Sequence, residues 1–279
     1  MFTITVMPFK NFTIFGERCS GTCWITKLVE ANFSKQACYP FGWKHFVHPD
    51  DPVAFPNTMV VVVVRNPIDW TRSFFKTPHH IPPENRTNFH TFLTSELVSR
   101  DAGSDTNRDL RPDGTLWKNI LEMRKDRHQE WCEFMEKRNH HIPHGCVWVS
   151  YESVKENPTK FLESIENATG WGKTKETWDF FEDTHFVGNT ESKTRNFTPV
   201  CYMKPKGEIR ALLVGTDGDP ADEKKRWSLE IITHFLKHMD VDFENKMSKL
   251  GSSFLSSDEQ NVVHVGTWAK TVLEDLVRE

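Results

Sequence analysis

The sequence predicts an α/β fold with a doubly wound central parallel sheet flanked by helices, and three observations lead to it. Residues 59–64 read Met-Val-Val-Val-Val-Val, a continuous apolar run that is typical of a strand covered on both faces. A second β-prone stretch, Phe12–Phe15, runs into a glycine-containing loop and then a helical pattern. Strand and helix patterns continue to alternate along the chain, which favours parallel strands joined by helical crossovers.

The remaining elements follow from hydrophobic periodicity and turn residues. Gly145–Ser150 predicts a further strand, and 171–222 has too little periodicity to predict more than irregular chain. The strand at 59–64 ends at Arg65-Asn66-Pro67, so Pro67 falls in the first turn of the next helix, where its missing N–H costs nothing. Apolar residues recur at helical spacing in six segments, which we predict as helices: 23–33, 68–76, 117–135, a segment opened by Asn157-Pro158, 227–239 and 265–277.

Three points concern the organisation of the chain. We predict a single domain over residues 1–279, with a C-terminal tail at 252–279 that contains the last helix. Residues 77–115 are rich in Pro, Asn, Asp and Arg, and loops of this length in a compact domain are usually lids or binding loops. In the 117–135 helix, Arg124 and His128 interrupt the apolar face; they either form the wall of a polar pocket or mark the edge of the buried stripe, and we prefer the edge.

Composition excludes several classes of partner. The formal net charge is −4, so the chain lacks the overall basic field that drives binding to nucleic acid. The longest apolar run is too short to cross a bilayer, and the first residues lack the pattern of a secretory signal. We therefore expect a cytoplasmic protein with neither nucleic acid nor membrane as partner. The six cysteines lack paired spacing, which favours free thiols.

The loop from Gly16 to Thr22 predicts an anion site. It lies between a strand and a helix, where backbone N–H groups can cradle a phosphate. Its two glycines are spaced as in a Walker loop, but Thr22 follows the second glycine where a nucleoside triphosphate site has lysine. That substitution weighs against a kinase or an ATPase.

A second motif follows the buried strand at 59–64. Arg65 stands at its carboxyl end, and Ser73 comes eight residues later on the next helix. Arginine makes fork-like contacts to phosphate, so this pair suits a second phosphate group.

The order of the two motifs, Gly-Glu-Arg-Cys-Ser-Gly-Thr (16–22) and Arg-Asn-Pro-Ile-Asp-Trp-Thr-Arg-Ser (65–73), resembles that of sulfotransferases dependent on 3′-phosphoadenosine 5′-phosphosulfate (PAPS). The resemblance extends to Tyr151-Glu152 and covers most of residues 11–170. It implies a P-loop-like fold and a reaction that needs no metal. Most cytosolic members carry lysine where this chain has Cys19, and the nearest cation is then Arg18.

The resemblance also implies roles for individual residues. Arg65 and Ser73 would hold the 3′-phosphate, with Lys204 and Lys206 as weaker additions, and Tyr151 would approach the adenine. Trp24 would stack near the adenine, or else serve as a core residue of its helix. The loop would surround the 5′-phosphosulfate with six residues: Arg18, Cys19, Ser20, Gly21, Thr22 and Cys23.

Catalysis by such a site needs a base for the acceptor proton and cations for the charge on the transferring oxygens. Lys44-His45 falls where the family keeps a lysine and a histidine. We assign His45 as the base, with His48 as its rival, and Lys44 and Arg18 as stabilising cations.

The acceptor is predicted as a hydroxyl or an amine of a small molecule or a carbohydrate, roofed by residues 77–115. The product of the cofactor would be adenosine 3′,5′-bisphosphate. Two alternatives stay open: a phosphotransferase using the same loop with ATP, and a non-catalytic nucleotide-binding protein. The helix at 265–277 can pack on the core or join a second subunit as a homodimer.

Overall fold

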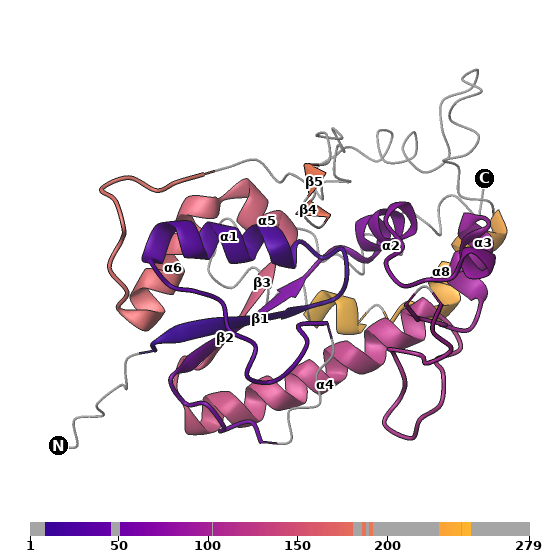
Figure 1. The fold of residues 1–279 in the computed structure, drawn as a ribbon, viewed down its shortest axis with the longest axis horizontal. Coiled ribbons are helices and arrows are strands. Elements are labelled where there is room, and N and C mark those ends of the chain that lie inside the picture. Colours follow the sequence, from indigo (N-terminus) through magenta and orange to yellow (C-terminus); the bar gives the residue numbers. More distant parts are fainter. Residues whose placement is uncertain are drawn as a thin grey trace. The chain divides into compact units, whose positions relative to one another are not determined.

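The computed structural model describes residues 9–45, 51–101, 103–180, 186–187, 190–191, 229–240 and 242–246. The tail at 252–279 and its predicted helix at 265–277 lie outside the described residues. The elements, shown in Figure 1, run in the order β1 (Asn11–Gly16), α1 (Thr22–Phe33), β2 (Thr58–Val64), α2 (Pro67–Lys76), η1 (Pro83–Arg86), α3 (Phe89–Thr94), α4 (Ile120–His141), β3 (Cys146–Ser150), α5 (Tyr151–Glu156), α6 (Pro158–Thr169), β4 (Phe186–Val187), β5 (Thr190–Glu191) and α8 (Leu229–His238).

The main sheet has three parallel strands in the order β1-β2-β3, which confirms the α/β class and the parallel sheet. On the other side of β1, Ala37 forms a parallel bridge with Phe12, and the N–H of Cys38 donates to the Phe12 carbonyl at 2.8 Å. The chain therefore runs to one side of β1 after α1 and to the other side with β2. In open α/β sheets, ligands bind at such a reversal, beyond the carboxyl end of the strand.

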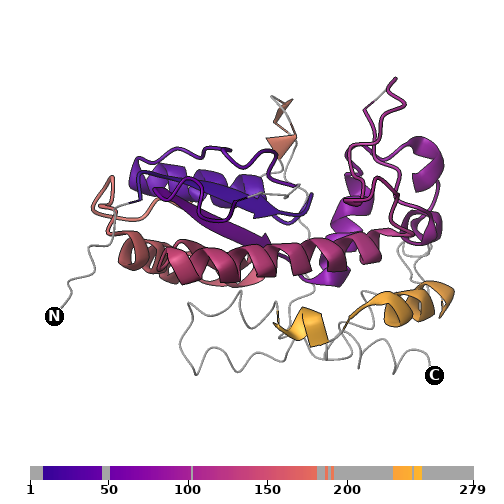
Figure 2. The same ribbon diagram turned by 90° about the horizontal axis from the view of Figure 1, so that it is seen from below.

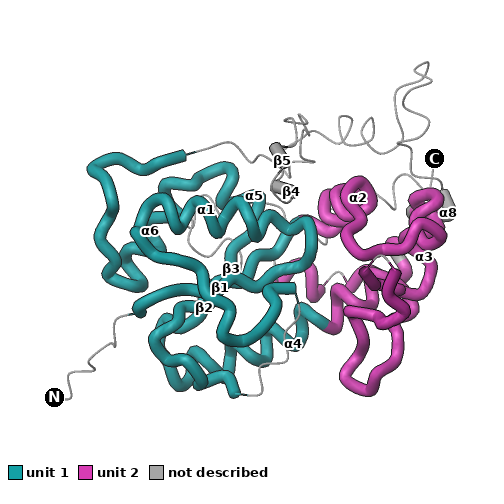
Figure 3. The backbone as a smooth tube through the Cα atoms, viewed as in Figure 1, with its two compact units in different colours: residues 1–65, 127–197, 250–260 teal, residues 66–126, 198–249, 261–279 magenta. Residues whose placement is uncertain are grey.

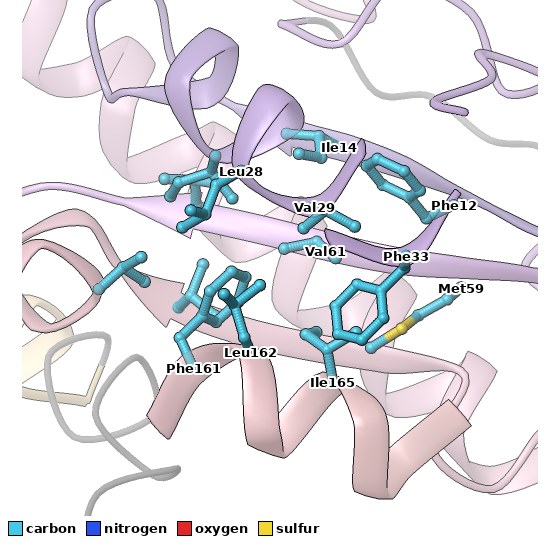
Figure 4. Close-up of a cluster of buried hydrophobic side chains, with 14 of the residues drawn as sticks. Phe12, Ile14, Leu28, Val29, Phe33, Met59, Val61, Phe161, Leu162 and Ile165 are labelled. Carbon is cyan, nitrogen blue, oxygen red and sulfur yellow. The ribbon is translucent and has the colours of Figure 1, made fainter. Parts of the chain in front are cut away.

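Helices cover both faces of this sheet, as predicted. On one face, residues of α1 and α6 pack on alternate residues of β1 and β2 (Figure 4), including Leu28, Phe33, Phe161, Leu162, Phe12, Ile14 and Val61. On the opposite face, Phe15 of β1 meets Phe134 of α4 with ring centroids 5.9 Å apart. Figure 2 shows the sheet between α1 and α4. All seven residues of β2 are buried, as a strand covered on both faces requires.

Side-chain caps set where several helices begin. Asn66 Oδ1 accepts from the Ile68 N–H at 2.9 Å, and Pro67 opens α2 as predicted. The prediction that the helix at 117–135 includes Trp117 is wrong, because Asn119 Oδ1 accepts from the Leu121 N–H at 3.0 Å and caps α4 there. Trp117 is buried outside that helix.

The chain divides into two compact units, coloured in Figure 3. Unit 1 comprises residues 1–65, 127–197 and 250–260; unit 2 comprises 66–126, 198–249 and 261–279. The chain leaves unit 1 after Arg65 and re-enters it at Arg127. Within the described ranges, no helix is long and apolar enough to cross a membrane.

In unit 2, the described part of residues 77–115 carries only the short helices η1 and α3, as predicted for a loop. Asp101 joins two parts of this segment: its carboxylate lies 2.8 Å from His80 Nδ1 and 2.7 Å from Arg108 Nη2. Arg124 contradicts the prediction that it marks the edge of a buried stripe, since it is 2% exposed and its Nε lies 2.7 Å from the buried Glu244 carboxylate.

Candidate functional site

The loop between β1 and α1 is a tight turn that excludes side chains at both of its glycines. The N–H and the hydroxyl of Ser20 both donate to the Glu17 carbonyl, at 3.1 and 2.6 Å. A Cβ at Gly16 would lie 2.8 Å from the Val63 carbonyl oxygen and 2.8 Å from Ser20 Oγ. Gly21 has a φ of +91°, and a Cβ there would lie 2.2 Å from the Tyr151 ring. The structure therefore requires glycine at both positions of the loop.

Gly21 is also the N-cap of α1, and it offers no side-chain oxygen to the first turn of the helix. The leading N–H groups of an α-helix have no intrahelical partner, and they favour an anion. Thr22 is buried at the start of α1, whereas Cys23 is exposed. The first turn of α1 thus directs backbone N–H groups toward the end of the loop.

Arg65, at the carboxyl end of β2, fastens the loop to the sheet. Its Nη1 donates to the Cys19 carbonyl at 2.8 Å, and its guanidinium lies 4.5 Å from the centre of the Tyr151 ring. Cys19 has a φ of +65°, a conformation that costs about 1–2 kcal/mol outside glycine. The bond from Arg65 helps to hold this strained residue in place. Arg65 and Tyr151 follow neighbouring strands, so the ends of β2 and β3 both contribute to the site.

Lys44 and His45 lie beside the beginning of the loop. The Gly16 N–H donates to the Lys44 carbonyl at 3.1 Å, and Lys44 Nζ donates to Cys23 Sγ at 3.0 Å. The Lys44 ammonium is therefore at the first turn of α1. Arg18 is buried, with its guanidinium 5.9 Å from the centre of the Trp43 ring, and that ring meets the His45 imidazole edge to face at 5.1 Å.

His45 is a buried, neutral imidazole. Burial lowers its pKa from 6.5 to about 3, a hydrogen bond to Gly16 opposes this shift, and the charges of Lys44, Arg18 and Arg127 add to it. Nδ1 lies 2.6 Å from the Gly16 carbonyl oxygen. Because a carbonyl oxygen can only accept, Nδ1 carries the hydrogen and Nε2 carries the lone pair. This tautomer can take up a proton at Nε2.

The structure places the other predicted site residues as follows. Trp24 and Tyr151 are both buried in the core cluster, with ring centroids 5.8 Å apart, so Trp24 occupies the core position considered as its alternative. Ser73 is buried on α2 in unit 2, and its pairing with Arg65 stays a prediction. His48, Lys204 and Lys206 lie outside the described residues.

Sequence reasoning gave no role to three buried charged or titratable residues near the loop: Glu17, Arg127 and His128. The prediction that His128 lies at the edge of a buried stripe is wrong, because it is fully buried and its Nε2 lies 3.1 Å from Glu17 Oε2. A polar residue interrupting an apolar helix face was the available signal. Such a residue is informative when it is buried, because it then requires a partner.

The description of the site is completed by a search for metal-binding groups and by comparison with known proteins. In the part of the chain that the structure describes, no group of three or more His, Cys, Asp or Glu side chains is placed to hold a metal ion. The chain matches no protein-family model, no curated protein and no solved structure.

Proposed function

We propose that the chain is a P-loop-like sulfotransferase that moves a sulfuryl group from PAPS to a hydroxyl or an amine of a small-molecule or carbohydrate acceptor. The observation that carries the proposal is the convergence on one loop of residues that the sequence motifs placed far apart. Arg65 donates a hydrogen bond to the Cys19 carbonyl at 2.8 Å, His45 donates one to the Gly16 carbonyl at 2.6 Å, and Lys44 donates one to Cys23 Sγ at 3.0 Å.

The donor groups of this loop fit a polyanion. Arg18, Arg65 and Arg127 are buried cations of unit 1, and Lys44 adds a fourth near the first turn of α1. Four positive charges and a helix N-terminus outnumber Glu17 and Glu152, the two buried carboxylates in the described part of unit 1, so a bound anionic ligand would balance the excess. The 5′-phosphosulfate would occupy the loop, while Arg65 would hold the 3′-phosphate.

When bound, PAPS supplies an activated sulfuryl group with a phosphate as leaving group. His45 would take the acceptor proton at Nε2, since its Nδ1–H is committed to Gly16. Lys44 and Arg18 would stabilise negative charge on the transferring and leaving oxygens. In the free protein the neighbouring cations help to lower the pKa of His45, and an anion that screens them makes His45 a stronger base.

The first test is calorimetric titration with adenosine 3′,5′-bisphosphate and with ATP, each with and without Mg²⁺. We expect the bisphosphate to bind without metal. Arg65→Ala should weaken the binding of the bisphosphate by at least about tenfold, since charge-assisted bidentate hydrogen bonds from arginine to phosphate are strong. Arg65→Lys should weaken binding less. Arg86→Ala, on the exposed face of η1, is the matched control. Preference for Mg²⁺-ATP would support the phosphotransferase alternative.

A second test concerns the base. With labelled PAPS and an acceptor found by screening, His45→Asn should lower turnover by about 10²–10⁴-fold. Its amide nitrogen can still donate to Gly16, so the affinity for bisphosphate should stay near that of the wild type. If no acceptor is ever sulfated although the bisphosphate binds, the chain is a non-catalytic nucleotide-binding protein.

A further inference from the structure

Glu17 is a carboxylate buried within the proposed anion-binding loop. It follows Gly16 directly, its carbonyl accepts both hydrogen bonds from Ser20, and its side chain is 1% exposed. The turn of the loop is therefore built on Glu17. A change in the position of Glu17 would move the whole cradle.

The Glu17 side chain meets His128 of α4, and both residues belong to unit 1. The His128 side chain is fully buried, and its Nε2 lies 3.1 Å from Glu17 Oε2. The imidazole packs on Trp131 with ring centroids 5.2 Å apart, which fixes its orientation. The contact therefore joins the loop after β1 to the helix that covers the opposite face of the sheet from α1.

A buried carboxylate is unfavourable in two ways at this place. Its own desolvation must be offset by a nearby donor or cation. It also repels an anion bound by the same loop, because charges inside proteins interact more strongly than in water. An imidazole whose Nε2 lies 3.1 Å from the carboxylate oxygen reduces both costs, and Arg18 and Arg127 add positive charge in the same region.

We propose that His128 is a positioning residue of the anion site, which holds Glu17 in place and offsets its charge so that the loop can accept a polyanion. The inference rests on the proposed function for its ligand, but the contact and its effect on the loop do not depend on sulfuryl transfer. His128 thus gives α4 a role in the anion site, although α4 lies outside both sequence motifs.

The test is a double-mutant cycle with His128→Leu and Glu17→Gln, with adenosine 3′,5′-bisphosphate as the probe. His128→Leu should weaken binding by at least about tenfold, because it leaves the carboxylate without this partner. Glu17→Gln alone should change binding by less than about threefold, because it removes the charge that needs offsetting. The double variant should recover most of the affinity lost in His128→Leu. A double variant that binds as weakly as His128→Leu would show that His128 only fills space, and would overturn the proposal.

A ligand-free measurement separates this proposal from the proposed function. Hydrogen exchange of residues 16–22 should be faster in His128→Leu and should return toward the wild-type rate when Glu17→Gln is added. His140→Leu, at an exposed position of the same helix, should leave it unchanged. If the wild type binds no bisphosphate, the proposed function is wrong and the exchange data decide alone. Equal exchange in all variants would then overturn the role of His128.

Discussion

Gly21 combines a left-handed backbone with a close packing contact. Alanine at this position would have the unfavourable φ of +91° and a Cβ 2.2 Å from the Tyr151 ring. We expect Gly21→Ala to lower the free energy of unfolding by about 2–4 kcal/mol, from backbone strain plus overpacking. Gly114 has a similar φ of +82° with no atom near its Cβ, so Gly114→Ala should cost only about 1 kcal/mol. Urea denaturation of both variants measures the difference, and equal losses would contradict the packing contribution.

His45 also makes stability depend on pH. Its folded pKa is about 3 against 6.5 for an unperturbed histidine, so between these values the unfolded chain binds a proton that the folded chain does not. Stability therefore rises with pH in this window and is lost as pH falls from 6.5 toward 3, by up to about 1.4 kcal/mol per pH unit from this group. Denaturation of the wild type and His45→Asn at about pH 4, 5, 6 and 7.5 tests this dependence. The variant should have the shallower slope below pH 6.5, and identical slopes would contradict the buried, neutral assignment.

At the scale of elements, Arg138 of α4 holds the segment that precedes β2 by hydrogen bonds to its backbone. The guanidinium is fully buried and donates to five backbone carbonyls: those of Pro52, Ala54, Phe55, Thr58 and Gly145. Burial lowers the pKa of this arginine. The contacts join α4 to the segments that lead into β2 and β3, and thereby fix where both strands start.

Replacing Arg138 should therefore be costly. Arg138→Met keeps the length of the side chain but leaves five backbone carbonyls without this donor, and we expect a loss of about 3–5 kcal/mol in the free energy of unfolding. Arg138→Lys should also destabilise, because an ammonium has three donors at one point. Lys137→Met, at the exposed neighbouring position, is the control, and thermal unfolding measured by circular dichroism gives the comparison. Similar midpoints for Arg138→Met and the control would contradict the role of this side chain.

Elements with a strong local signal were predictable from the sequence. The apolar run of β2 and the Asn66-Pro67 start of α2 agree with the structure because burial and capping are encoded within a few residues. The one-turn helix α5 was not predicted, since its start depends on the Ser150 side chain and not on a repeat of apolar residues. Trp117 was placed on α4 because it continues the apolar spacing, whereas Asn119 begins the helix later.

Some parts of the candidate site could likewise be predicted from the sequence, and others could not. The loop and Arg65 are visible as motifs, because a turn between a strand and a helix needs glycines at fixed positions. The contact between Glu17 and His128 is not visible, because it joins residues far apart in the chain that no local pattern relates. His45 could be proposed from the sequence, but its tautomer follows only from the distance to the Gly16 carbonyl.

At the scale of the whole molecule, unit 1 is built from separate pieces of the chain. Its N-terminal piece, residues 1–65, supplies β1, α1 and β2, and the piece that begins at Arg127 supplies β3 and α6. The core cluster contains residues of both pieces, such as Leu28 and Val61 from the first and Phe161 and Leu162 from the second. Neither piece can bury its apolar surface alone.

This discontinuity predicts how the chain responds to division. A fragment of residues 1–126 would expose one edge of β2 and the apolar face of α1 that α6 covers, and the burial lost from Phe161 and Leu162 alone is worth about 1.5–3 kcal/mol per side chain. Since a whole domain is stable by only about 5–15 kcal/mol, we expect this fragment to lack a cooperative unfolding transition. The mixture with residues 127–279 should regain it. Cooperative unfolding of the isolated fragment would mean that β1, α1 and β2 form a folding unit without β3 and α6, and circular dichroism during urea titration distinguishes the two results.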